Sequence, residues 1–536
     1  MPGGRRSLQN CRTVVEIVGR FDSDAFPPTV PENAHVKVTT MKSVVSQSIR
    51  IAVLITGLGA VLCAQAVSIP KTTGPIPAAA GSVPFMAAAN NLVPTDLSKF
   101  GYLEEEFILS GNANVYDWAA DGTVTIKTPN VPYANRILLR RPANAARFSG
   151  TVIVEVTNAA RRYDWAMMWG YGRDYFLEHG DAWVSLTTPG ALNSLKKFNP
   201  SRYAALSMEN PTPAAVCPGT EKNGASPIEE GLRWDYYSQV AAALKSGVPG
   251  QPMAGFNVRR VFMTTQAGDI TTYINAFHDR SRLLNGSPVY DGYLVRDPPA
   301  PARINQCAPA IAATDSRRQI KDIDVPVISV VAQGEVPDSM KVRKPDSDDP
   351  KGRYRLYEIA GAAHIDNFAY TGLPSFDEQN LLGLAQGTAD WPFNLKCDPE
   401  IALSRQPLLM YAFHGAYRNL DEWVAKGVLP PKAARIETKD GALVMDEFGH
   451  AVGGVRNPWV DAPVETIVTT SPGPGTCREL GHAIPFEAAR ISSLYPSTRD
   501  RARKVNDSVD RAVSARYFTE TDGKKMKVDL AKDVGK

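Results

Sequence analysis

Three side chains in the middle of the chain have types and an order that suit acyl transfer. Thr265, Glu335 and His364 follow one another, and each comes at or just after an apolar run that is typical of a buried strand. A hydroxyl nucleophile, a histidine base and a carboxylate that orients the histidine together cleave esters through a covalent acyl-enzyme. In this scheme Thr265 attacks, His364 transfers the proton and Glu335 orients the imidazole.

The histidine and the acid both have a plausible setting. His364 lies in YEIAGAAHIDNF, where a strand runs into a turn of small residues, a position suited to a general base. A turn histidine bonded to the backbone would give the same sequence. The acid should follow the strand VPVISVVA, as Glu335 does, with Asp338 as the alternative. A solvated loop carboxylate is the competing interpretation of Glu335.

The nucleophile is the least regular member of the set, because the turn VFMTTQAGD contains no serine. Strand and helix pass close together at such a turn, so small residues are needed two positions before and after the nucleophile. Thr265 has Met263 and Ala267 there, whereas Thr264 has larger neighbours on both sides. Thr265 is the better candidate. Its extra methyl group and restricted χ1 make a turn that has lost its chemistry equally consistent with the sequence.

An acyl-transfer site also needs main-chain N–H donors for the developing oxyanion. The expected donors are Gln266, directly after the threonine, and Asn158 or Ala159 in the loop after the strand TVIVEVTN. The histidines are scattered, and the sequence has no H-E-x-x-H, close cysteine pair, G-x-x-x-x-G-K-[ST] or G-x-G-x-x-G. We therefore expect neither a metal nor a cofactor.

The elements that must position these residues alternate along the chain. Apolar, β-branched runs predict strands at residues 104–111, 123–129, 136–142, 151–158, 182–189, 258–265, 290–295, 325–332 and 353–361. Helical spacing predicts helices at residues 171–180, 229–247, 269–284 and 407–427. The alternation predicts an α/β fold, with a mainly parallel sheet covered by helices on both faces. A Pro-rich excursion at 190–228 and an irregular, cap-like region at 366–480 are expected to line the pocket.

Several of these segments resemble the family of alpha/beta hydrolase domain-containing proteins, which are large and often exported. The resemblance runs from about Tyr102 to about residue 500 and rests on GTVIVEVTN, HGDAWVS, LNSLKKFNPSRY, RWDYYSQV, TTYINAFH, YDGYLV, VPVISVV, YEIAGAAH and GGVRNPWVDAPVET. It implies an alpha/beta-hydrolase fold over residues 101–500. It also implies a carboxylic ester hydrolase that acts on a small-molecule ester.

The family's nucleophile turn resembles G-x-S-Q-[ST]-[GA], and T-Q-A-G places Thr265 at the serine, with Met263 where the family has glycine. A gap placed differently would put Thr264 or Ala267 there, and Ala267 would leave no nucleophile. His364 matches the histidine of A-G-x-x-H, and Glu335 falls in the stretch that carries the family's acid. The alternative to an active enzyme is a catalytically inactive hydrolase-fold protein that binds a ligand or a partner in the same pocket.

Composition sets the remaining limits. The chain of 536 residues is 43% apolar, which suffices for a large core in one or two domains. Its 59 basic and 56 acidic residues give a net charge of only +3, so nucleic acid is not an expected partner.

The amino-terminal region has the pattern of an export signal. Residues 41–66 combine a basic start, an apolar run and the A-x-A site Ala64-Gln65-Ala66, so we expect cleavage and a secreted or periplasmic protein without a membrane span. An uncleaved anchor is the alternative. Residues 1–40 precede this signal, with Met41 as an alternative start, and a Pro/Ala-rich leader follows at 67–100. The basic tail, residues 501–536, is expected to be a solvated helix.

Four cysteines remain after cleavage, and an even number in an exported protein suits two disulfides. They are Cys217, Cys307, Cys397 and Cys477, and their pairing cannot be read from their spacing.

Overall fold

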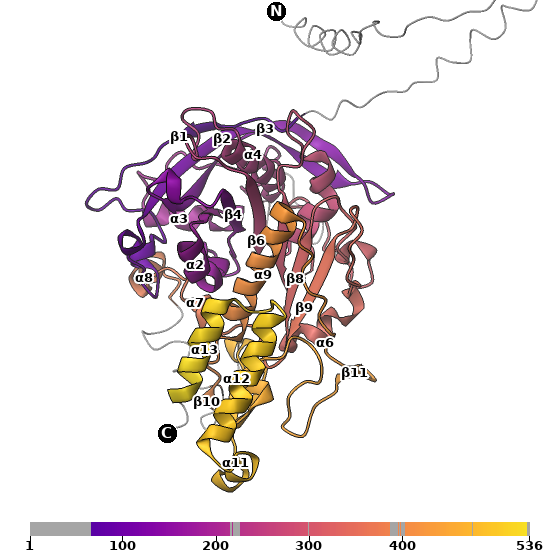
Figure 1. Ribbon diagram of the computed structural model, residues 1–536. Helices are drawn as coiled ribbons and strands as arrows, with labels where there is room; N and C mark the ends of the chain where they lie inside the picture. The colour runs from indigo at the N-terminus through magenta and orange to yellow at the C-terminus, as the bar shows by residue number, and fades with distance from the viewer. Residues whose placement is uncertain are drawn as a thin grey trace, which may run out of the picture. The chain divides into compact units, whose positions relative to one another are not determined.

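A nine-stranded sheet, in the order β1-β2-β3-β5-β4-β6-β7-β8-β9, is the framework of the protein (Figure 1). Its strands are β1 Lys71–Thr73, β2 Tyr102–Trp118, β3 Val124–Pro142, β4 Thr151–Val156, β5 Ala182–Leu186, β6 Arg260–Thr265, β7 Gly292–Arg296, β8 Val327–Ala332 and β9 Tyr354–Ile359. Strands β4 to β9 are parallel, while β1, β2 and β3 join antiparallel at one edge. The mainly parallel sheet expected from the sequence is confirmed.

The computed structural model describes residues 66–532 except 215–216, 218–225, 298–299, 386–394, 396, 398–401 and 474. The upstream segment and almost all of the expected signal segment lie outside the described residues. Within the described part of the chain, no helix combines the length and apolar character needed to cross a bilayer.

Helices cover both faces of the sheet. They are α2 Met167–His179, α3 Leu192–Phe198, α4 Arg233–Lys245, α5 Asp269–Thr272, α6 Val336–Ser339, α7 Asn367–Tyr370, α8 Phe376–Leu382, α9 Leu408–Lys426, α10 Pro458–Asp461, α11 Ala488–Leu494, α12 Thr498–Ser514 and α13 Glu520–Lys532. Successive residues of a strand point to opposite faces. On β7, Gly292 lies against Leu420 of α9, whereas the Tyr293 ring packs 6.4 Å from that of Tyr273, just after α5. The two helices therefore lie on opposite faces.

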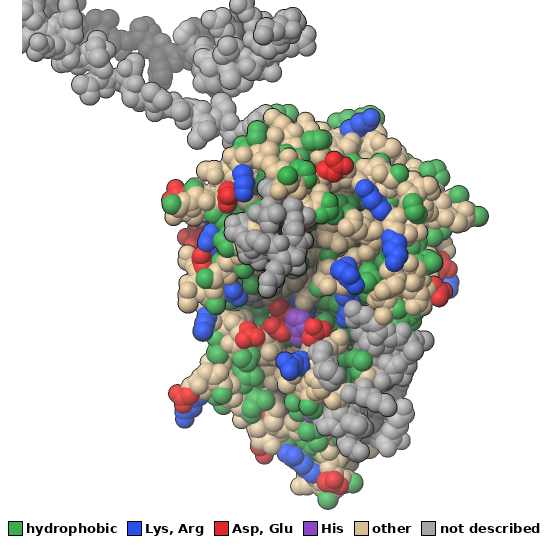
Figure 2. Space-filling view, turned by 180° about the vertical axis from the view of Figure 1, so that it is seen from behind, with side chains coloured by type: hydrophobic (Ala, Val, Ile, Leu, Met, Phe, Trp, Pro, Cys, Tyr) green, Lys and Arg blue, Asp and Glu red, His purple; other side chains and the backbone are tan. Residues whose placement is uncertain are grey.

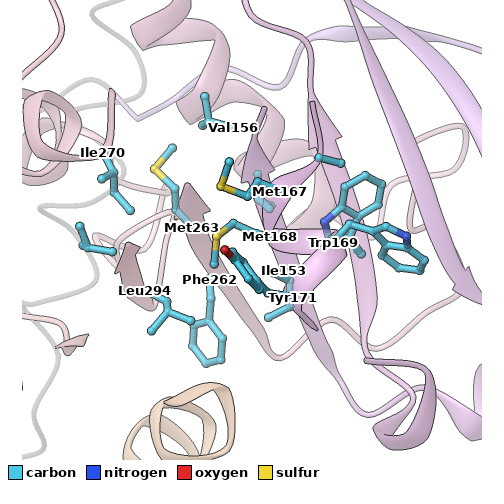
Figure 3. Close-up of a cluster of buried hydrophobic side chains, with 14 of the residues drawn as sticks. Ile153, Val156, Met167, Met168, Trp169, Tyr171, Phe262, Met263, Ile270 and Leu294 are labelled. Carbon is cyan, nitrogen blue, oxygen red and sulfur yellow. The ribbon is translucent and has the colours of Figure 1, made fainter. Parts of the chain in front are cut away.

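A continuous apolar core fills the space between the central strands and α2. Figure 3 shows side chains of β4, β6 and β7, among them Ile153, Phe262 and Leu294, gathered with Met168 of α2. These strands are buried along their length except at Arg260, the first residue of β6, as expected for the central strands of a parallel sheet. The rigid strands fix where the loops at their carboxyl ends begin.

Two predicted elements differ from the structure. The runs at 123–129 and 136–142 belong to the single strand β3. Its prolines are tolerated because β5 pairs only with Ile137–Arg140, so the edge of β3 opposite β2 is open at Pro129 and Pro132. The helix predicted at 269–284 is α-helical only at its start. It continues as a π-turn over Tyr273–Phe277 and a 3-10 turn over His278–Arg280.

The leader and the tail are also more integrated than expected. Strand β1 of the leader pairs with β2, and Phe85 and Met86 are fully buried. In the tail, α12 buries Val505 and Val509, one helical turn apart, so this helix is not solvated on all sides. Both segments belong to the same core as the sheet.

The region after residue 366 contains α7 to α10 and two small sheets. One joins β10 Ala402–Leu403, β14 His482–Pro485 and β13 Glu465–Val468, and the other joins β11 Thr438–Lys439 and β12 Ala442–Leu443.

The four cysteines form two disulfides, Cys217–Cys307 and Cys397–Cys477. The prediction of two disulfides is thus confirmed, and the structure supplies the pairing.

Candidate functional site

Four polar side chains meet where adjacent parallel strands end. Gln266 follows β6, Asp297 follows β7, Glu335 comes shortly after β8, and His364 follows β9. In a parallel sheet such ends lie at one edge, which is where ligands of α/β folds bind. Figure 2 shows a histidine in a hollow on one face, with acidic side chains beside it.

His364 emerges from a tightly held turn. Gly361 adopts φ +80°, which glycine accepts without strain, and its N–H donates to the side-chain oxygen of Gln333 at 2.7 Å. The N–H of Gly334 donates to the carbonyl of Ala362 at 3.1 Å. The turn after β9 is therefore tied to the turn after β8.

This arrangement brings the predicted acid and histidine together. Nδ1 of His364 lies 2.5 Å from Oε1 of Glu335, and each side chain is about one-quarter exposed. Burial opposes charge on Glu335, but the hydrogen bond and charge of His364, with the charge of Arg296, hold its pKa below the ordinary value. Glu335 is thus a carboxylate at neutral pH.

The other imidazole nitrogen faces an amide. Gln266 Nε2 lies 3.2 Å from His364 Nε2, and Gln266 Oε1 accepts from Asn158 Nδ2 at 2.6 Å. The N–H of Ala160 donates to Asn158 Oδ1 at 2.8 Å, which fixes the orientation of that amide. Gln266 therefore presents its NH₂ group to His364, so His364 Nε2 is the acceptor and the proton lies on Nδ1, an assignment that follows from the hydrogen-bond network.

The Thr265 hydroxyl does not lie at His364. It donates to the carbonyl of Val156 at 2.7 Å and accepts from the N–H of Ala267 at 2.9 Å, and the residue is fully buried. Thr265 is the last residue of β6, and its hydroxyl bonds the end of this strand to Val156 at the end of β4. The hydroxyl of Thr264 is equally buried, where it accepts from Tyr417 at 3.3 Å.

The expected oxyanion donors are only partly available. The main-chain N–H of Asn158 donates to the carbonyl of Trp165 at 3.0 Å, so it is not free to bind an oxyanion. Asn158 acts instead through its side chain, which holds Gln266. The N–H groups of Gln266 and Ala159 remain the expected donors.

A cavity of about 160 Å³ opens beside these residues. Its lining consists of Gln266, Asp297, Ala300, Arg318, Glu335, Asp338, Ser339, Val342 and His364. No described residue of the segments 190–228 and 366–480, which were expected to line the pocket, lines this cavity. The segments after β7 and β8 surround it, because they leave the sheet next to His364.

A divalent ion is another group that the side chains of Asp297, Glu335 and His364 could hold. Potential ligand atoms of Asp297, Glu335 and His364 all lie within 4.8 Å of one another. However, ligands about 2.0–2.1 Å from a tetrahedral ion are more than 3 Å apart, and the His364–Glu335 contact is 2.5 Å. The buried guanidinium of Arg296, 3.1 Å from Asp297, also supplies positive charge. The set fits an acid–histidine pair better than a metal centre.

The sequence interpretation missed Asp297, Arg296 and the side chain of Gln266. Asp297 had a usable signal, because it is a carboxylate directly after a buried strand, as a site residue of an α/β fold should be. Arg296 is a second signal, because a charged residue at the end of a buried strand also indicates a site.

The buried position of Thr265 leads to a stability prediction. Thr265→Val keeps the β-branched shape but leaves the Val156 carbonyl and the Ala267 N–H without their partner. We expect the free energy of unfolding to fall by about 1–3 kcal/mol, measured by urea denaturation. Thr265→Ser is the control: it keeps the hydroxyl and should lose only about 1 kcal/mol for the methyl group. Equal stability of Thr265→Val and the natural protein would contradict this structural role.

Several solved structures resemble the chain. A putative dienelactone hydrolase from Klebsiella pneumoniae is 14% identical, with a TM-score of 0.25, over 52% of this chain and 99% of its own. Esterase Est22 is 9% identical, with a TM-score of 0.29, over 56% of this chain and 84% of its own. A thermostable esterase from Pseudomonas putida is 13% identical, with a TM-score of 0.28, over 55% and 84%. At such TM-scores these likenesses support no statement about chemistry.

No curated protein matches the chain. A family profile described as an alpha/beta hydrolase domain matches residues 72–528, which begin within β1 and include most of the tail helices. With a match over most of its length, the chain belongs to the alpha/beta hydrolase domain family.

Proposed function

We propose that this hydrolase-family protein binds a small ligand in the cavity beside His364 and forms no acyl-enzyme. One observation carries the proposal: the amide of Gln266 lies 3.2 Å from His364 Nε2, where a nucleophilic hydroxyl would have to be. The lone pair of His364 Nε2 is therefore engaged. The only hydroxyls at the end of β6, those of Thr264 and Thr265, are buried and bonded elsewhere.

Carboxylic ester hydrolysis through Thr265, His364 and Glu335 is the second candidate. The contact of 2.5 Å between His364 and Glu335 favours it, because an acid that orients a histidine is what a general base needs. This candidate requires the Thr265 side chain to leave Val156 and Gln266 to turn away from His364. The N–H groups of Gln266 and Ala159 would then face the oxyanion.

A fluorophosphonate probe and a panel of p-nitrophenyl esters separate the two candidates. We expect no adduct on Thr265 by mass spectrometry and no ester turnover above that of His364→Ala. An adduct on Thr265, with turnover that both Thr265→Ala and His364→Ala abolish, would establish the hydrolase instead.

The binding role has its own measurement. Calorimetric titration with p-nitrophenyl acetate should give saturable binding, and Val342→Phe, which fills the cavity, should weaken it at least tenfold. The matched control is Val248→Phe, at an exposed position that does not line the cavity. Equal binding by both variants would place the ligand elsewhere.

We also propose that the protein is exported. Its two disulfides support this location, because disulfides persist in oxidising compartments. We expect amino-terminal sequencing of protein recovered outside the cytoplasm to give Val67 as the first residue.

A further inference from the structure

Asp297 is held in an unusual conformation next to His364. Its φ of +38° lies in the left-handed region, which a residue other than glycine adopts only at a cost in free energy. Its N–H donates to the carbonyl of Val330 at 2.9 Å, and its Oδ1 accepts from the N–H of Ala332 at 2.9 Å. Both the backbone and the carboxylate are therefore fixed to β8.

The second oxygen of Asp297 faces the imidazole. Oδ2 lies 3.7 Å from His364 Nδ1, on the same nitrogen that Glu335 contacts. The side chain is only 8% exposed, and among the described residues neither Oδ2 nor His364 Nδ1 forms a hydrogen bond of good geometry, although Nδ1 contacts Glu335. A buried carboxylate oxygen without a hydrogen bond is costly unless a positive charge lies close to it.

Arg296 explains why a second carboxylate is tolerated here. Its guanidinium is fully buried and lies 3.1 Å from Asp297 Oδ2. Burial raises the pKa of Asp297, while the charges of Arg296 and His364 act in the opposite direction. Arg296 is thus the counter-charge for the pair of acids around His364.

We propose that Asp297 is a second positioning carboxylate for His364, which can accept the Nδ1 proton when Glu335 does not. Glu335 is 26% exposed and lies on the wall of the cavity, so a bound ligand or water can compete for it. Asp297 lines the same cavity, but it is only 8% exposed and is anchored to β8 through Ala332. A shift of about 1 Å brings the 3.7 Å contact to hydrogen-bond length. This inference goes beyond the proposed function and holds for either candidate.

Solid-state NMR of the protein with ¹⁵N-labelled histidine tests the inference without any ligand or turnover. A histidine N–H bonded to a carboxylate gives a strongly downfield proton resonance, and the His364→Asn variant assigns it. The variants are Glu335→Ala, Asp297→Asn and the two combined. Asparagine at 297 keeps the bond to Ala332 through its oxygen and presents NH₂, a donor, to His364.

We expect each single variant to keep the downfield Nδ1–H resonance and the double variant to lose it. Asp338→Asn, which changes another carboxylate of the same cavity, is the matched control and should change nothing. Loss of the resonance in Glu335→Ala alone, or its survival in the double variant, would overturn the inference. If Asp297→Asn fails to fold, Asp297→Gly suits the positive φ and removes the carboxylate. Because no ligand is involved, either result is independent of whether the protein binds or hydrolyses an ester.

Discussion

Replacement of Glu106 by glutamine is expected to lower the free energy of unfolding by about 3–5 kcal/mol. Glu106 is fully buried on β2 and contacts the guanidinium of Arg136, which is also fully buried. Its other oxygen accepts from Arg202 at 2.6 Å. Glutamine keeps the shape but removes the negative charge, so two buried guanidinium groups lose their closest counter-charge. Removal of one member of a buried ion network costs more than the network itself contributes.

The same change should release the leader from the sheet. Arg136 donates to the carbonyl of Phe85 at 2.6 Å, and Arg202 donates to the carbonyls of Pro77 and Ser82 at 2.9 and 3.0 Å. These bonds hold a segment with little regular structure of its own. Limited proteolysis of Glu106→Gln should therefore cleave near residues 77–85 before the rest of the chain.

Glu105→Gln is the matched control for Glu106→Gln. Glu105 is the adjacent residue, points to the opposite face of β2 and forms a partly exposed ion pair with Arg141 at 2.7 Å. Because this pair is less buried and involves a single guanidinium, its replacement should cost less, about 1–2 kcal/mol, in urea denaturation. Similar losses for the two variants would mean that the buried network does not hold the leader.

The architecture of the protein could be predicted from its sequence because the hydrophobic pattern that indicates a strand is strong in the central strands. The segments that contain β4 and β8 are nearly continuous apolar runs, those that contain β6 and β9 are rich in β-branched and aromatic residues, and each strand is expected within a few residues of its observed bounds. The antiparallel edge was harder, because Pro129 and Pro132 interrupt the pattern of β3 without ending the strand. The tail was misjudged because only every third or fourth residue of α12 faces the core.

The site was only partly predictable, because residue type does not reveal where a strand ends. Thr265 pairs with Val295 of β7, so it still belongs to the sheet, and the first side chain beyond it is Gln266. A difference of one residue turns a side chain to the other face. A search for a hydroxyl therefore selected Thr265, although Gln266 is the residue that reaches His364. Glu335 and His364 were found because each follows a strand whose end is clear.

Removal of the disulfide Cys397–Cys477 is the other change with a large expected effect. The cysteines are 80 residues apart, and a bond that closes a loop of this size stabilises the folded state by about 4 kcal/mol in the chain-entropy account. Near Cys477, the carbonyl of Glu479 accepts from the N–H of Ile365 at 3.0 Å. The disulfide therefore supports the residue that follows His364, and its loss should loosen the imidazole as well as the fold.

The double replacement of Cys217 and Cys307 by alanine separates these two effects. That disulfide closes a loop of similar size, with a separation of 90 residues, so the loss of stability should be comparable. Its nearby contacts are different. In the loop that leads to Cys307, the N–H of Ala302 donates to the carbonyl of Gly268 at 3.1 Å, whereas the Cys397–Cys477 disulfide lies near the turn of His364. Modification of His364 by diethylpyrocarbonate, read by mass spectrometry under conditions where both variants stay folded, should be faster only without Cys397–Cys477. Equal rates in the two variants would mean that this disulfide stabilises the fold without positioning His364.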